Sequence, residues 1–503
     1  MPVEISNLLQ LKEFSQFIEK NMGLHFPENK MTDLQRGMVD TSKEFGFNNV
    51  ESCVEWLLSS SLTDQQIEIL ASYLTIGETY YFRVEPDFNA LENYILPELI
   101  HLRKDSGKYL RIWSAASSTG EEPYSLAILV RKLIPDIKDW NITILATDIN
   151  TRSLAKAEKG IYGNWSFRNN PEWLKKIYFT PLVDERYQIN RNIKEMVRFF
   201  YLNLARDTYP SLLNNTNGMD IIFCRNVLMY FTPELAQKVL NNLHGSLVEK
   251  GWLFVPPIEI TLGFSSKFDR VNFPGTILHQ KGVGKDQQKL REQELPLPAS
   301  APFFPIKEIA ERPLEKSFIK YPKPQISRPQ KNEVVPDFYQ QALGLYKSQS
   351  YSEAIKIILE LPPEKQKNPK VIILLVRAYA NQGKLSSALE CIDQGIKENK
   401  LDPQLYYLRA TILQELNLIE DSIQSLKKTI YLDPKFTLAY FTLGWIVRHS
   451  NNNNKQESQQ YFKNALRLID QLDKENIILQ SEGMTAGRLK EIILSIEREE
   501  NYA

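Results

Sequence analysis

Short apolar runs that favour strands alternate with amphipathic stretches in the middle of this 503-residue chain. The first expected strand begins at Leu110, and the others cover residues 141–146, 197–202, 219–224 and 252–255. One expected helix begins near Pro123, and the others cover residues 86–102, 151–159 and 233–247. Strands that alternate with helices in this way predict an α/β fold with a parallel sheet covered on both faces.

Helical periodicity dominates the two ends of the chain. Residues 8–73 carry apolar side chains at helical spacing with several breaks, which predicts a small bundle of short helices. Beyond Pro336, Ala354, Ala388 and Ser422 recur at intervals of 34 residues, the period of tetratricopeptide repeats. About four helical pairs and a terminal helix are expected there, stacked into an all-α solenoid whose concave surface binds another protein.

Nine prolines separate the central part from the repeats, among charged residues without periodicity. This composition predicts an extended tether, with a proline-rich ligand for another module as the alternative. The expected division is therefore an N-terminal helical domain (1–75), an α/β domain (76–285), a Pro-rich linker (286–335) and a repeat domain (336–503).

Charge and cysteine content exclude several classes of protein. Basic and acidic residues balance at 61 each, so no overall field favours nucleic acid, and no nucleic-acid partner is expected. Cys53, Cys224 and Cys391 are far apart, which favours reduced thiols. No apolar run approaches the length of a membrane span, and the first residues lack the layout of a signal peptide. We expect a cytoplasmic protein without direct membrane insertion.

Polar residues follow four of the expected strands. Glu121 and Glu122 come after the first, Asp148 ends the second, Asn203 follows the third, and Arg225 with Asn226 follows the fourth. Strand ends of a parallel sheet meet at one edge, where such folds bind ligands. Carboxylates repel phosphates, so a nucleoside is the better candidate ligand, with Asp148 accepting hydrogen bonds from its ribose. The alternatives are helix-opening carboxylates at the turn and an N-cap or turn role for Asp148.

A short aromatic connection, TIGETYYFR at residues 75–83, precedes the α/β part. Its tyrosines and phenylalanine suit an anchor in the core, whereas the planar guanidinium of Arg83 suits a bidentate grip on a carboxylate. The helix over residues 30–44 carries both signs of charge, typical of a solvated face, with a weak receptor-binding patch as the alternative.

Four motifs in this order, TIGETYYFR, RIWSAASSTGEEPYSLAI, ILATDINTRSLAKAEKGIY and DIIFCRNVLMYF, resemble the CheR-family chemotaxis receptor methyltransferases over about residues 1–285. The resemblance implies a Rossmann-like fold and methyl transfer from S-adenosylmethionine to glutamates of methyl-accepting chemoreceptors. A glutamate carboxylate is already a nucleophile, so this chemistry requires no catalytic base, metal or covalent intermediate.

The resemblance also implies roles for individual residues. The cofactor would be bound by Thr79, Arg83, Glu122, Asp148, Asn203, Leu204, Cys224, Arg225 and Asn226. Arg83 would orient the substrate carboxylate and Tyr230 would frame the methyl group, with packing of helix on sheet as the alternative for Tyr230. Chemoreceptors would be the protein substrate, and an unidentified protein or peptide would bind the repeats.

Two departures from the family pattern lie near the expected site. Gly77 stands where the family usually has asparagine or another polar residue, so one cofactor contact is expected to fall to backbone. Pro256 and Pro257 stiffen a loop that is glycine-containing in the family, while Glu259 keeps its register. An adaptor that recruits proteins without strong catalysis is therefore the alternative to an active enzyme, and an enzyme for a small-molecule acid is a more distant one.

Overall fold

Parallel strands form the middle of a seven-stranded sheet in a computed structural model of the chain. The structure describes residues 8–59, 61–75, 77–105, 107–256, 259, 267–282, 338–449 and 455–498. The strand order is β6-β2-β1-β7-β8-β10-β9, and all neighbours from β6 to β8 run parallel. The strands are β1 (Tyr109–Ala115), β2 (Asn141–Asp148), β6 (Val197–Tyr201), β7 (Met219–Cys224), β8 (Leu247–Phe254), β9 (Phe268–Phe273) and β10 (Thr276–Lys281).

Both faces of this sheet are buried, because alternate side chains of each strand enter different cores. Ile112 of β1 and Ile221 of β7 belong to one hydrophobic cluster, whereas their neighbours Trp113 and Ile222 belong to another. The α/β fold and its two covered faces are as the sequence predicted. The helices of this part are α5 (Glu85–Ala90), α6 (Leu96–Arg103), α7 (Glu121–Leu133), α8 (Thr151–Lys159), α10 (Arg191–Lys194) and α11 (Pro233–Ser246).

Three features of this part were not expected from the sequence. A π-helical segment, Leu91–Ile95, interrupts the helix expected over residues 86–102. The antiparallel strands β10 and β9 extend the sheet beyond β8. A second sheet of three strands, in the order β3-β5-β4, lies between β2 and β6 in the sequence together with helix α9. Its elements are β3 (Ile161–Gly163), α9 (Glu172–Tyr178), β4 (Phe179–Pro181) and β5 (Arg186–Ile189).

The N-terminal part is a bundle of four described helices, as expected. They share one core, in which Phe14, Leu34, Cys53 and Leu70 are completely buried. The side chain of Thr63 accepts a hydrogen bond from the Gln66 N–H and completes a capping box at the start of the fourth helix. The helices are α1 (Leu8–Met22), α2 (Met31–Glu44), α3 (Val50–Leu58) and α4 (Asp64–Leu74).

The described C-terminal residues form helical pairs, as the repeat period predicted. Ala354, Ala388 and Ser422 are completely buried where paired helices approach closely. The pairs α12–α13, α15–α16, α17–α18 and α19–α20 precede the terminal helix α21. Their bounds are α12 (Phe338–Lys347), α13 (Tyr351–Leu359), α14 (Pro363–Gln366), α15 (Pro369–Asn381), α16 (Leu385–Glu398), α17 (Pro403–Glu415), α18 (Ile419–Leu432), α19 (Thr437–His449), α20 (Lys455–Ile469) and α21 (Ala486–Arg498).

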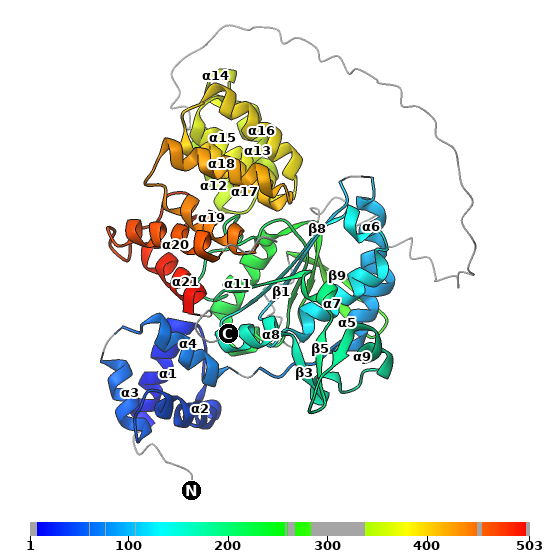
Figure 1. Cartoon of the computed structure of the whole chain (residues 1–503), viewed down its shortest axis with the longest axis vertical. Helices are drawn as coiled ribbons and strands as arrows, with labels where there is room; N and C mark the ends of the chain where they lie inside the picture. The colour runs from blue at the N-terminus through cyan, green and yellow to red at the C-terminus, as the bar shows by residue number, and fades with distance from the viewer. Residues whose placement is uncertain are drawn as a thin grey trace, which may run out of the picture.

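The N-terminal helices (blue) and the repeats (yellow to red) both flank the sheet-containing part (Figure 1). The first helices of two pairs, α17 and α19, line a cleft against β6 and β2 together with α21. Within this contact Glu415 Oε2 lies 3.4 Å from Arg111 Nη1, and both side chains are almost completely buried. We expected the repeats to present a binding surface to another protein, and did not foresee that α17, α19 and α21 contact the sheet of the same chain.

Several expectations lie outside the described residues: the linker at 286–335, the insertion at 451–454 and the structure of Pro257. All three cysteines are free thiols, and two of them are buried. Among the helices that the structure describes, none combines the length and the apolar character needed to cross a lipid bilayer.

Candidate functional site

The turn between β1 and α7 exposes backbone at the carboxyl edge of the sheet. Ala116, Ser118 and Gly120 all have positive φ angles, of 63°, 50° and 93°. A Cβ at Gly120 would lie only 2.7 Å from the Ala157 Cβ, so this position requires glycine. The turn directs the Ser118 N–H at the Asp148 Oδ2, at 2.8 Å. The ends of β1 and β2 are thereby joined at one point.

A cleft lies beside this turn, at the carboxyl ends of the parallel strands. Its empty space is about 720 Å³ with open solvent at the mouth included, within the range of small-molecule sites. Five of the residues expected at the site line it: Asp148, Asn203, Leu204, Asn226 and Tyr230. The structure therefore brings the ends of β2, β6 and β7 together around one cavity, as the edge argument predicted.

Asp148 presents a carboxylate with acceptor capacity to spare. Its Oδ2 accepts the Ser118 N–H and its Oδ1 accepts the Asn150 N–H at 2.8 Å, which uses two of about four lone-pair positions. Burial raises the pKa of Asp148 above its ordinary value, and the backbone N–H groups of Asn150 and Ser118 oppose that shift. The N-cap of α8 is Asn150, whose side chain accepts the Ser153 N–H, so an N-cap role for Asp148 is wrong. The alternative of a turn aspartate agrees with the structure, because Asp148 accepts the N–H of Asn150, two residues on.

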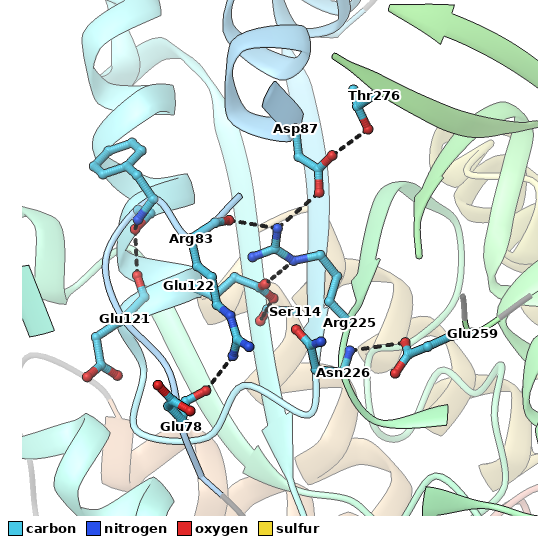
Figure 2. A network of polar contacts seen from close by, with 12 residues as sticks. Glu78, Arg83, Asp87, Ser114, Glu121, Glu122, Arg225, Asn226, Glu259 and Thr276 are labelled. Atoms are coloured by element: carbon cyan, nitrogen blue, oxygen red, sulfur yellow. Dashed lines mark hydrogen bonds and ion pairs between the residues drawn. The ribbon is translucent and has the colours of Figure 1, made fainter. Parts of the chain in front are cut away.

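Glu122 and Arg225 form an ion pair next to the cleft instead of lining it (Figure 2). The Arg225 Nε lies 2.8 Å from Glu122 Oε2, and its Nη1 lies 3.0 Å from Asp87 Oδ2. The same Nη1 donates to the Arg83 carbonyl at 2.8 Å. Burial alone would lower the pKa of Arg225, but Glu122 and Asp87 outweigh it and raise that pKa. This network fixes the segment that carries Arg83.

Arg83 and Tyr230 are close enough to interact electrostatically. Burial and Glu259 raise the pKa of Tyr230, whereas Arg83 opposes the shift. The Arg83 guanidinium donates to the Glu78 carbonyl and lies 5.8 Å from the Tyr80 ring centroid (Figure 2). Tyr230 belongs to the cleft lining but Arg83 does not. Arg83 is therefore better placed to contact a second molecule that approaches the cleft than a ligand inside it.

Thr79, Cys224 and Gly77 complete the set of expected residues. Thr79 is half-buried outside the cleft lining, and Cys224 is completely buried in the core on one face of the sheet. A contact between Cys224 and a cofactor would therefore have to come from its backbone. Gly77 does line the cleft, and its carbonyl accepts a hydrogen bond from Ser118 Oγ at 3.1 Å.

The chemistry of the lining fits a nucleoside that carries a positive charge. Of the described residues that line the cleft, none is lysine or arginine, so a phosphate would find no cation there. Apolar walls come from residues that the sequence did not single out: Met22, Leu24, Leu74, Val227 and Phe231. The first three belong to or border the N-terminal helices, and their proximity depends on packing that a local pattern does not encode. Asp87, the second carboxylate on Arg225, was missed for the same reason.

Glu259 is a further acid at this edge. Its Oε2 accepts the Asn226 N–H at 3.0 Å, and its N–H donates to the Pro256 carbonyl at 2.9 Å. Burial raises its pKa from 4.5 to about 7, with backbone N–H groups of residues 226, 227 and 229 opposing the shift. Glu259 therefore changes charge near neutral pH beside a residue of the cleft.

Protonation of Glu259 makes the stability of the fold depend on pH. Between pH 4.5 and about 7 the folded chain keeps a proton that the unfolded chain has lost, so the free energy of unfolding falls as the pH rises through this window. Glu259→Gln should flatten that slope and stabilise the protein at pH 8 by on the order of 2 kcal/mol. Urea unfolding at pH 5 and pH 8 measures it, with exposed Glu234→Gln as the control. Equal slopes in wild type and Glu259→Gln would contradict the assignment.

Comparisons with known proteins identify the family of the chain. Residues 77–274 match the family model described as CheR methyltransferase, SAM binding domain, and residues 403–436 match that of the tetratricopeptide repeat. A chemotaxis protein methyltransferase of Borreliella burgdorferi is 31% identical over 256 residues, which cover 50% of this chain and 89% of the relative. One of Vibrio anguillarum is 32% identical over 282 residues, which cover 54% of this chain and 97% of the relative. Among solved structures, a crystal structure of MamA has a TM-score of 0.24 at 20% identity, covering 27% of this chain and 81% of that chain.

Proposed function

This chain belongs to the chemotaxis protein methyltransferases, and from that premise we propose that it methylates glutamate side chains of methyl-accepting chemoreceptors. It is an S-adenosylmethionine-dependent protein methyltransferase with tetratricopeptide repeats. The observation that supports the proposal is the cleft, in which Asp148 is available to a ribose and the lining residues that the structure describes include no lysine or arginine for a phosphate. We also propose the division into domains at residues 1–75, 76–285, 286–335 and 336–503.

S-adenosylmethionine supplies a methyl group on a positively charged sulfur. Asp148 would hold the ribose hydroxyls, while backbone near Asn203 and Asn226 and the side chain of Leu204 would bind the rest of the nucleoside. Tyr230 would exclude water around the methyl group, and Arg83 would orient the glutamate carboxylate that attacks it. Alignment and exclusion of water are the protein's contributions, since the carboxylate needs no base at neutral pH.

Arg83→Ala tests the substrate role separately from the cofactor role. Because Arg83 lies outside the cleft lining, the dissociation constant for S-adenosylhomocysteine should change by no more than about twofold. The value of kcat/KM for the receptor should fall by roughly 100-fold, because a bidentate carboxylate contact would be lost. Arg83→Lys keeps the charge without the fork and should recover only part of the rate. Unchanged transfer in Arg83→Ala would remove Arg83 from the mechanism.

The direct test of the function is methyl transfer to a receptor. The full chain is incubated with methyl-labelled S-adenosylmethionine and the cytoplasmic fragment of a chemoreceptor, and the label is then released by alkali. We expect volatile labelled methanol, which identifies glutamate methyl esters. A folded protein that binds S-adenosylhomocysteine but transfers no label would support the adaptor alternative, for which the Pro256-Pro257 pair is the motivating sequence feature.

The repeats are proposed to recruit a partner protein to this enzyme. Since α17, α19 and α21 lie against the methyltransferase part, a partner would bind the outer helices or compete for the inner surface. Exposed apolar side chains of the repeats include Leu359, Leu418 and Tyr431. Substituting these residues should lower partner capture without changing the affinity for S-adenosylhomocysteine.

A further inference from the structure

The segment between β6 and β7, residues 202–218, connects the cofactor cleft to the repeats. At its start Leu202, Asn203 and Leu204 line the cleft. Further along, Leu212 packs in a hydrophobic cluster of the repeats, beside residues of α15, α16 and α17. One stretch of chain therefore forms a wall of the cleft and a contact with the repeat helices.

The repeats hold the far end of this segment through buried polar contacts. The Leu212 N–H donates to Glu482 Oε2 at 3.1 Å, and Asn217 Nδ2 donates to Glu415 Oε2 at 3.1 Å. A Cβ at Gly218 would lie 3.0 Å from the Ala380 carbonyl oxygen, which shows how closely the two backbones approach. This end of the segment has a fixed position relative to the repeats.

A second contact from the repeats reaches the cleft wall itself. Asp207 Oδ2 accepts the Asn203 N–H at 2.7 Å, while the Asp207 N–H donates to the Asn203 carbonyl at 2.9 Å. The same Oδ2 lies 3.2 Å from Arg488 Nη2 on the terminal helix α21. The Arg488 guanidinium also lies 4.4 Å from the ring centroid of Tyr201, the last residue of β6. One arginine of the repeat part thus contacts a residue that precedes Asn203 in the chain, Tyr201, and one that follows it, Asp207.

We propose that Arg488 and Asp207 are positioning residues for the cofactor site, so that the repeat part completes the methyltransferase. Asp207 holds the Asn203 backbone, and Arg488 keeps the Asp207 carboxylate turned towards that N–H. Without the guanidinium, a carboxylate that is 19% exposed can turn to solvent. Asn203 and Leu204 would then lose their fixed place in the cleft wall. The inference rests on the cofactor cleft and is independent of which protein substrate is methylated.

The test uses Arg488→Ala in the full chain, with two readouts that need no methyl transfer. Titration calorimetry should give an affinity for S-adenosylhomocysteine on the order of fivefold weaker than that of wild type. Hydrogen exchange of residues 202–208 in the ligand-free protein should become faster, because the Asn203 N–H loses its fixed acceptor. Arg488→Lys keeps the charge and should recover most of the affinity.

Lys490→Ala is the matched control, since Lys490 lies on the same helix and its Nζ pairs with Asp470 Oδ1 at 2.6 Å instead of with Arg488 or Asp207. It should leave both readouts at wild-type values. If Arg488→Ala is folded by its urea transition and matches wild type in affinity and exchange, the proposal is wrong. Equal losses in Lys490→Ala would also overturn it, because they would assign the effect to α21 as a whole and not to the contact between Arg488 and Asp207.

Discussion

Arg225→Met should lower the free energy of unfolding by about 3–5 kcal/mol, because it removes the partner of two buried carboxylates. The Arg225 side chain is only 3% exposed and lies between Glu122 and Asp87. Ser114 and Thr276 donate to the remaining oxygens of these acids at 2.8 and 2.7 Å, but neither brings a positive charge. Two uncompensated carboxylates would be left between β1, α5 and α7.

The matched control is the same substitution at the surface. Arg191→Met breaks an ion pair with Glu195 at 2.6 Å in which the arginine is 89% exposed, and it should leave the free energy of unfolding nearly unchanged because solvent screens the pair. Urea unfolding of both variants measures the difference. If Arg225→Met is as mild as Arg191→Met, the Glu122–Arg225–Asp87 network does not stabilise the site.

Asp148→Ala should weaken binding of S-adenosylhomocysteine by roughly 100-fold, the loss of two charged hydrogen bonds. Both oxygens of Asp148 already accept a backbone N–H, and the remaining lone pairs are the ones proposed for the ribose. Asp148→Asn keeps the volume but turns an amide NH₂ towards one backbone N–H, so it should also bind weakly.

Calorimetric titration of the full chain measures this affinity, and exposed Asp136→Ala serves as the control. Urea unfolding is measured in parallel, because Asp148→Ala also removes the acceptor of two turn N–H groups. A folded Asp148→Ala variant with wild-type affinity would place the ribose elsewhere.

The sequence predicted those parts of the fold that depend on local periodicity. Strand β7 has the predicted limits, Met219 and Cys224, because all six of its residues are buried and all but Asp220 are apolar. Strand β8 begins at Leu247, whereas the prediction began it at Trp252, because exposed Glu249 and Lys250 interrupt the apolar pattern before that residue. The strands β3, β4 and β5 have only three or four residues each, too few for a period to be recognised.

The residues of the candidate site also divide into those that the sequence could place and those that it could not. Asp148, Asn203 and Asn226 could be placed together from sequence, since each follows a parallel strand and strand ends share an edge. Arg225 was expected beside the cofactor, but its charge is taken up by Asp87, a helix residue 138 positions earlier in the chain. The contact between Arg488 and Asp207 spans 281 positions. Such pairings depend on how whole elements pack, so spacing along the chain does not predict them.

We propose above all that the cleft at the carboxyl ends of β1, β2, β6 and β7 binds S-adenosylmethionine. A crystal structure of the full chain with S-adenosylhomocysteine tests it most directly. We expect the ribose hydroxyls to lie within about 3.2 Å of the Asp148 carboxylate, and the nucleoside to contact Leu204 and the Asn203 backbone. A ligand bound at another place, or one whose ribose does not contact Asp148, would contradict it.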